Sequence, residues 1–381
     1  MSIHRTKQGK YEVRYREGSR HRSKTFDLRS DAREFEAATR LSKQRGERII
    51  RRKDSPTFSQ CAREYMDRRE ILGKATKTLL FNAGCLDNHI LPYIGHLPMV
   101  DVNIGRLEDW QQQALKDGST PYMLNRSREL IGQISKYAVK RGYMAGNPVD
   151  ALEILPHRVR KGQVATIDQI EQMREYLLSK DRLGYATLIS VLAYQGTRPS
   201  EALALRWDHL QGRQLTTEQH LADGEIVGHT KTGRDRHPNV PSPVLADLAE
   251  WKLACGRIEG LIFPRADGLA WRDHDWRNWS KRWFKSAAGE AGLLTFDEET
   301  GRWEGGFRPY DLRHTCASLK IRAGVPPATI AAEMGHSLEV LFRVYGHEIE
   351  AMKGHEVMPI DQSISEIRSA RVRKMFDRKA S

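Results

Sequence analysis

The sequence has few cysteines and no long hydrophobic run. Its four cysteines are scattered without a CxxC pair, a pattern that indicates neither a zinc site nor a disulfide framework. The mean hydropathy is −0.62, and the sequence lacks the roughly 20 consecutive apolar residues that a membrane-spanning helix needs. The first ten residues also lack the apolar stretch of a secretory signal. These absences predict a soluble protein of the reducing cytoplasm.

The positive charge of the sequence is concentrated near its N-terminus. Residues 1–53 contain 17 lysines and arginines against 7 acidic residues, whereas residues 54–156 contain 12 of each. Residues 157–355 contain 27 basic and 26 acidic residues, so the N-terminal segment supplies most of the formal net charge of +13. A local basic excess is typical of a surface that binds nucleic acid. The alternative, a solubilising tail, is disfavoured by the regular pattern of this segment.

That N-terminal segment predicts a small sheet followed by a helix. Tyr11, Val13 and Tyr15 alternate with polar residues, and a Glu-Gly-Ser turn precedes a second strand at residues 23–26. Residues 32–44 have the apolar spacing of a helix. A strand face of such a sheet fits a DNA groove. The basic side chains of the sheet are Arg14, Arg16, Arg20, Arg22 and Lys24. The alternative is that these side chains only face water.

Residues 57–155 predict a bundle of helices. Their apolar spacing predicts helices near residues 58–66, 77–90, 105–115 and 122–142, with Pro92 ending the second of them. The segment carries no net charge, so any contacts with DNA phosphates must be local. From the residues alone, this could be any small helical bundle.

Two later segments place charged side chains at helix ends. In residues 196–207 (GTRPSEALALRW), Gly196 ends one helix and Pro199 begins the next, so Arg198 lies at the junction. In residues 306–347, one helix begins near Asp311, and Gly335 ends the next. A third short helix, predicted at residues 338–344, precedes a tyrosine. These breaks would direct Arg313, His314, His336 and Tyr345 toward one place.

The order of these residues resembles that of the tyrosine recombinase (phage integrase) family. Arg198 matches the arginine of the first family motif, and the pattern LRHT…MGH…Y supplies Arg313, His336 and Tyr345. Glu201 matches the acidic partner of the first arginine. Between the two motifs, the resemblance assigns Lys231 to the mobile lysine of a β-hairpin, which the residues predict as strands at 225–227 and near Val240. A solvated lysine is the ordinary alternative there.

The resemblance implies a chemistry for each of these residues. The two arginines would bind the phosphodiester, Tyr345 would attack it to form a 3′-phosphotyrosine, and Lys231 would protonate the leaving 5′ oxygen. His336 would bind the phosphate or take the tyrosine proton. No cofactor is implied, and no carboxylate cluster near the motifs suggests metal-dependent cleavage. Arg234 and Arg236, in the same loop, are expected to contact phosphates.

One residue departs from the family pattern. Three residues before the second arginine the family usually has histidine, and this chain has Tyr310. A tyrosine still donates a neutral hydrogen bond but cannot carry imidazolium charge. Two other functions stay open: a type IB topoisomerase, which the separate basic segment disfavours, and a DNA-binding relative without activity, which the nearly complete residue set disfavours.

The resemblance also implies an architecture and partners. We expect a mainly α-helical, multidomain chain with small β-sheets: an arm-type DNA-binding domain and linker at residues 1–53, a helical core-binding domain at 57–155, a catalytic domain at 165–355 and a tail at 356–381. The tail is helix-competent and, in the family, often docks on a neighbouring subunit. The partners would be double-stranded DNA with core-type and arm-type sites, three further copies in a tetramer, and accessory proteins, in the cytoplasm of a bacterial host.

Two segments of the second half have no catalytic assignment. Trp276, Trp279 and Trp283 are spaced as one face of a helix, so we expect them in the core rather than stacked on bases. The acidic, glycine-containing residues 295–305 have no function that the sequence indicates.

Overall fold

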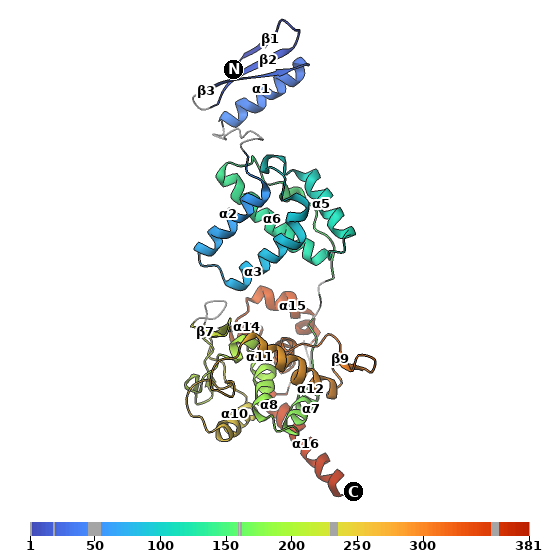
Figure 1. Ribbon diagram of the computed structural model, residues 1–381. Coiled ribbons are helices and arrows are strands. Elements are labelled where there is room, and N and C mark those ends of the chain that lie inside the picture. Colours follow the sequence, from blue (N-terminus) through green and yellow to red (C-terminus); the bar gives the residue numbers. More distant parts are fainter. Residues whose placement is uncertain are drawn as a thin grey trace. The chain divides into compact units, whose positions relative to one another are not determined.

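The computed structural model in Figure 1 describes residues 2–17, 20–44, 55–158, 160, 162–228, 235–351 and 358–380, without the side chains of residues 16, 17, 20, 34, 38, 39, 41–44 and 374–380. It divides into two compact units, Met1–Val159 and Arg160–Ser381. The chain is mainly α-helical with small antiparallel sheets, which confirms the predicted fold class. Within the described ranges, each helix is too short or too polar to cross a membrane. The finer division into arm, bundle, catalytic domain and tail stays a prediction.

The first unit begins with a three-stranded antiparallel sheet and a helix. The elements are β1 (Ser2–Arg5), β2 (Tyr11–Glu17), β3 (Arg20–Phe26) and α1 (Arg29–Gln44). Val13 is fully buried, and the rings of Tyr15 and Phe26 lie 5.4 and 5.2 Å from the ring of Phe35 on α1. The alternating residues of β2 therefore face the helix, as the period-2 pattern predicts.

The basic side chains of this sheet do not share one face. In the β2–β3 register, Lys24 lies opposite Val13 and Arg22 opposite Tyr15, so both are on the helix side. The Lys24 ammonium lies 4.7 Å from the centre of the Phe35 ring. Arg14, opposite Ser23, is on the other face. Arg22 and Lys24 therefore lie on the face that α1 covers, and Arg14 lies on the opposite face.

The rest of the first unit is a helical bundle. Its core includes Phe58, Trp110 and Ile131. The elements are α2 (Phe58–Ile71), α3 (Thr76–Cys85), the π-helix η2 (Leu86–Ile90), α4 (Leu91–Ile94), η3 (Met99–Asp101), α5 (Ile104–Lys116), α6 (Pro121–Arg141) and η4 (Pro148–Ala151). We expected Pro92 to end the second helix, but it does not. It lies in the first turn of α4, where a proline needs no backbone hydrogen bond, and η2 connects α4 to α3 without a break.

The second unit builds its core from helices and three two-stranded sheets. Its first half comprises α7 (Ile167–Leu178), α8 (Leu183–Ser190), the π-helix η5 (Val191–Gln195), α9 (Pro199–Ala202), η6 (Trp207–His209), β4 (Leu210–Gln211), β5 (Gln214–Leu215), β6 (His220–Ala222), β7 (Glu225–Val227) and α10 (Ser242–Cys255). Its second half comprises α11 (Asp273–Asn278), the π-helix η7 (Trp279–Phe284), α12 (Lys285–Glu290), β8 (Thr295–Asp297), β9 (Arg302–Glu304), α13 (Asp311–Arg322), α14 (Pro327–Met334), α15 (Leu338–Ala351) and α16 (Ile360–Ala380). Trp279 is buried and Trp276 and Trp283 pack against the core, which confirms their predicted placement.

The tail forms helix α16, which packs on its own unit. Ile364 is fully buried, and the guanidinium of Arg368 lies 3.0 Å from a carboxylate oxygen of Glu171 on α7 and 2.8 Å from one of Asp247 on α10. Both carboxylates are buried and also bind Arg174. Because a buried carboxylate is costly without a charged partner, these contacts tie α16 to the unit.

Candidate active site

Arg313 is the buried centre of a cluster of charged side chains in the second unit. It lies in the first turn of α13 and is 1% exposed. Its Nη1 donates to the carbonyl oxygen of Gly196 (2.6 Å), and its Nη2 donates to that of Met334. Each of these carbonyls ends a helix, where the backbone carries partial negative charge. Burial and the nearby Arg198 lower the pKa of Arg313 to about 10, so it stays charged at neutral pH.

Arg198 and Arg236 lie beside Arg313 and share one carboxylate. Arg198, at the start of α9, donates from Nη1 to Oε1 of Glu201 (2.7 Å). The Nη2 of Arg236 lies 2.6 Å from the other oxygen of Glu201, which is 1% exposed. Burial alone would raise the pKa of Glu201, but Arg236 and Arg198 outweigh it and lower the pKa. Three guanidiniums therefore face a single carboxylate, an arrangement suited to binding an anion.

His336 adds a neutral donor to this cluster. It directly follows Gly335, whose φ of 65° ends α14 as predicted. Its Nε2 lies 2.8 Å from Nη2 of Arg313. Because arginine only donates, Nε2 must be the unprotonated nitrogen, and the proton is on Nδ1. Burial and the charges of Arg313 and Arg198 lower the pKa of His336 to about 4. Within the described residues its buried Nδ1 has no hydrogen-bond partner.

Tyr345 is buried, and its hydroxyl contacts a different histidine. It is 3% exposed, and its oxygen lies 2.6 Å from Nδ1 of His314. Burial raises the pKa of Tyr345 and lowers that of His314, so both groups are neutral at pH 7. Gly162 covers the imidazole so closely that a Cβ there would lie 2.5 Å from its Cδ2. His314 was in the segment that the sequence singled out, but nothing in the sequence gave it a role.

Two sequence profiles match most of the chain. The phage integrase family profile matches residues 163–351, and the phage integrase central domain profile matches residues 58–154. The chain belongs to the phage integrase family. It is a site-specific recombinase of the tyrosine class, an enzyme that breaks and rejoins DNA strands.

Relatives and solved structures agree with this membership. The ICEBs1 integrase of Bacillus subtilis (strain 168) is 23% identical over 371 residues, which cover 91% of this chain and 95% of that protein. The structure of a λ integrase dimer bound to a core site has a TM-score of 0.61 at 15% identity, over 94% of this chain and 97% of that one. The Tn1549 transposon integrase in complex with a circular intermediate DNA has a TM-score of 0.63 at 16% identity, over 83% and 100%.

The recombinase holds Tyr345 inside a helix rather than after one. Helix α15 continues through Gly346 to Ala351, so the prediction that a short helix ends before Tyr345 was wrong. A glycine inside a helix costs only about 1 kcal/mol. Leu341 and Tyr345, four residues apart, are both buried, and this packing outweighs that cost.

Of the other predicted site residues that the structure describes, Tyr310 is exposed and Arg236 is buried. Tyr310 is 44% exposed, and its ring centre lies 5.7 Å from that of His314, edge to face. Arg236 was expected to contact DNA phosphates, but it is only 5% exposed and donates to the carbonyl of Met334 (2.8 Å). Its guanidinium is held between this carbonyl and Glu201, and its role at DNA stays a prediction. Lys231 and Arg234 lie outside the described residues.

The hairpin before Lys231 pairs differently from the prediction. Strand β7 pairs with β6, not with a strand near Val240. The turn between them is Asp223-Gly224, with φ values of 53° and 85°. Asp-Gly with two positive φ angles is the preferred two-residue hairpin turn, so a local signal that was overlooked determines this pairing.

His336 should titrate far below an ordinary histidine. We expect an NMR titration midpoint near pH 4, against about 6.5 for an unperturbed histidine. Because the folded pKa is the lower one, the stability that depends on neutral His336 is present above about pH 6.5 and is lost as the pH falls through about 4. His336→Gln assigns the resonance, and a midpoint near 6.5 would contradict the buried, arginine-bound imidazole.

Proposed function

We propose that this recombinase cuts one DNA strand by attack of Tyr345 on a phosphodiester held by Arg198 and Arg313. The observation that supports this most is the buried cluster of three arginines and one carboxylate, beside a His336 Nδ1 that has no partner among the described residues. The cluster carries an excess of positive charge, which the negative charge of a phosphodiester would neutralise. Arg198 and Arg313 would offer planar guanidinium donors to its non-bridging oxygens.

The same groups stabilise the transition state. Negative charge on the phosphoryl oxygens increases as the tyrosine oxygen approaches, and fixed donors around it lower the barrier. His336 remains neutral at pH 7 and donates its Nδ1 proton as a hydrogen bond. Glu201 keeps Arg198 directed outward and Arg236 fixed.

His314 takes the proton of the attacking tyrosine in this proposal. The raised pKa of Tyr345 means that the hydroxyl does not ionise by itself at neutral pH. The neutral His314 Nδ1, 2.6 Å away, accepts the proton as the oxygen–phosphorus bond forms. The bond to the 5′ oxygen breaks, and Lys231 protonates that oxygen. The 3′-phosphotyrosine keeps the energy of the broken ester, so attack by another 5′-hydroxyl rejoins DNA without ATP.

DNA would also bind the first unit. On the bundle, a groove between α2 and α6 is lined by two tyrosines and five basic side chains: Tyr65, Tyr137, Arg68, Arg69, Lys136, Lys140 and Arg141. This local excess accounts for phosphate binding by a segment with no net charge. We assign the N-terminal sheet to a second, arm-type class of DNA site. The sheet would contact this DNA through Arg14, on the face away from α1, and through the neighbouring basic residues of the sheet.

The expected assembly is a tetramer on two core-type DNA sites. A λ integrase structure with a TM-score of 0.59 shows that protein as a tetramer bound to a Holliday junction, which supports the same intermediate here. We propose that the recombinase integrates or excises a phage or mobile element in the cytoplasm of a bacterial host. Accessory DNA-bending proteins would assist, and α16 would exchange its docking site with that of a neighbouring subunit.

A nicked core-type DNA site tests the activity directly, because loss of the short cut fragment traps the covalent intermediate. In EDTA, the wild-type chain should form an adduct that peptide mapping places on Tyr345. Tyr345→Phe should bind the same DNA and form none, since only the nucleophilic oxygen is lost. An adduct that persists in this variant would place the nucleophile elsewhere, and a wild-type chain that binds without reacting would favour the non-catalytic alternative.

His314→Asn tests the proton acceptor. Asparagine keeps a polar side chain but cannot take a proton, so single-turnover cleavage should slow by about 100-fold or more. The wild-type rate should also fall as the pH drops below the pKa of His314, and the variant should lose this dependence. His347→Asn, at an exposed histidine on α15, is the matched control. A wild-type rate and pH profile in His314→Asn would remove His314 from the mechanism.

A further inference from the structure

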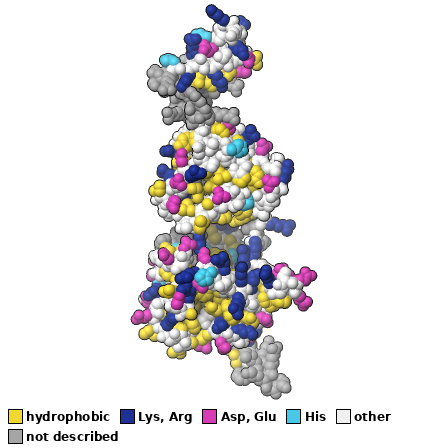
Figure 2. Space-filling model, viewed as in Figure 1, with side chains coloured by type: hydrophobic (Ala, Val, Ile, Leu, Met, Phe, Trp, Pro, Cys, Tyr) yellow, Lys and Arg dark blue, Asp and Glu magenta, His cyan; other side chains and the backbone are white. Residues whose placement is uncertain are grey.

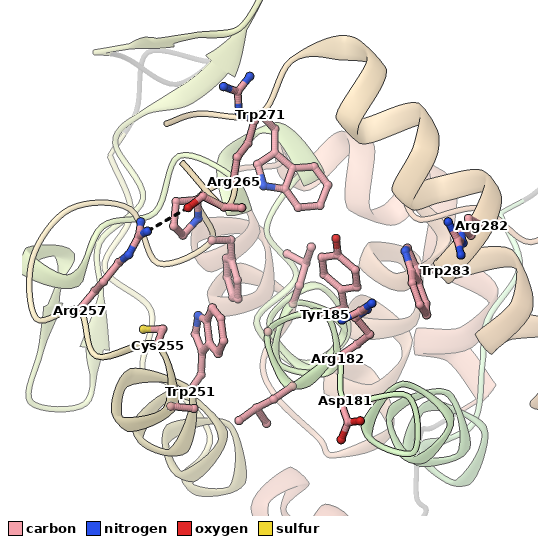
Figure 3. A pocket seen from close by; sticks show the side chains of 17 residues that line it. Asp181, Arg182, Tyr185, Trp251, Cys255, Arg257, Arg265, Trp271, Arg282 and Trp283 are labelled. Carbon is pink, nitrogen blue, oxygen red and sulfur yellow. Dashed lines mark hydrogen bonds between the residues drawn. The ribbon is translucent and has the colours of Figure 1, made fainter. Parts of the chain in front are cut away.

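The second unit contains a pocket that shares no residue with the catalytic cluster. It has a volume of about 690 Å³ and lies between the start of α8, the end of α10, residues 263–271 and η7. Figure 3 shows its aromatic walls, formed by Tyr185, Trp251, Trp271 and Trp283. We call it the aromatic pocket. Trp271 is 5% exposed, and its indole N–H has no hydrogen-bond partner within the described residues.

The aromatic pocket is also positively charged. Four arginines line it against a single aspartate, Asp181. Arg265 is neutralised by Asp267 and Asp275. The guanidiniums of Arg182 and Arg282 instead lie 4.7 and 5.3 Å from the ring centre of Trp283, and neither has a carboxylate partner in the described part of the chain.

Exposed apolar residues are close in sequence to the residues that line the aromatic pocket. Leu253 is 84% exposed, Ile258 75% and Leu269 59%, and each is within two residues of a lining residue. Aromatic and arginine side chains next to exposed aliphatic ones are typical of a protein–protein interface. This composition favours a protein partner over a small ligand.

The β8–β9 hairpin has the complementary chemistry. Figure 2 shows acidic side chains where Figure 1 places this hairpin, and Glu298 and Glu299 are exposed at its turn. Phe296, on β8, is 48% exposed. Asp297 accepts hydrogen bonds from Glu299 N (2.9 Å) and Thr300 Oγ1 (2.8 Å), which fixes the turn. The hairpin therefore presents an aromatic ring and acidic groups on a defined support.

The hairpin does not fill the aromatic pocket of its own chain. Lys285 Nζ on α12 donates to the carbonyl of Trp303 (3.1 Å), and a Cβ on Gly289 would lie 2.2 Å from that indole, so β9 is packed against α12. The hairpin and the pocket are both within the described residues, and none of residues 295–304 lines the pocket. A β8–β9 hairpin that occupies the pocket would therefore come from another copy of the chain.

We propose that the β8–β9 hairpin of one copy docks in the aromatic pocket of a second copy. Phe296 would pack on the tryptophans, and Glu298 and Glu299 would pair with Arg182 and Arg282. Because hairpin and pocket are different surfaces of one chain, the contact is head-to-tail, which closes into a ring when the rotation between copies permits. The contact gives a role to residues 295–305, and it does not depend on the DNA chemistry of the active site.

Charge reversal tests this contact in the full chain without DNA. We expect the wild-type chain to self-associate in sedimentation velocity at about 1–100 µM, the weak end of the range for protein interfaces. Arg182→Glu with Arg282→Glu, or Glu298→Arg with Glu299→Arg, should each weaken association roughly 100-fold, because like charges then face each other. Mixing the two variants should restore it, since each supplies the intact surface that the other lacks.

A matched reversal distinguishes this contact from general charge effects. Glu108→Arg with Asp109→Arg changes two exposed acidic residues on α5 and should leave association unchanged. A monomeric wild-type chain throughout the range, or variants that associate normally, would overturn the proposal. A mixture of the two variants that fails to associate would also overturn the proposal. A labelled single-stranded oligonucleotide tests the competing partner: if the arginine reversal weakens its binding but not self-association, the pocket binds nucleic acid instead.

Discussion

The active site depends on the buried guanidinium of Arg313. Removing such a charge from water is costly, and two backbone carbonyls, those of Gly196 and Met334, compensate for it. These carbonyls end η5 and α14, and Arg313 itself lies at the start of α13. One side chain therefore fixes three helix termini that are far apart in sequence. Arg198 and His336 each lie two residues after one of these carbonyls, so the same contacts help to position them.

The protonation states of the site follow from the same buried charge. Burial and the positive groups close to His336 lower its pKa and keep it neutral, so its Nε2 accepts from Arg313 and its Nδ1 offers a proton. Tyr345 is buried as well, and the group that touches its hydroxyl is neutral His314 rather than an arginine. In the proposed mechanism these tasks are separate: Arg198, Arg313 and His336 bind the phosphate, and His314 accepts the proton of the nucleophile.

Local signals in the sequence predicted much of this arrangement. As expected, Gly335 ends α14, and Pro199 begins α9 directly after Arg198, because glycines and prolines at helix ends act within a few residues. The contact of His314 with Tyr345 spans 31 residues and depends on how α13 packs against α15, which no local pattern encodes. The burial of Arg236 likewise depends on Glu201, whose Oε2 it shares with the backbone N–H of Arg198 while the Arg198 guanidinium binds Oε1.

If the arginine cluster neutralises a phosphodiester, its contribution to cleavage should depend on the negative charge of the substrate. A methylphosphonate at the cleavage position removes the negative charge and keeps the reacting bonds. Arg198, the most exposed arginine of the cluster, can be replaced with the least harm to packing. Arg198→Ala should slow cleavage strongly on ordinary DNA and far less on the methylphosphonate. An equal loss on both substrates would contradict it.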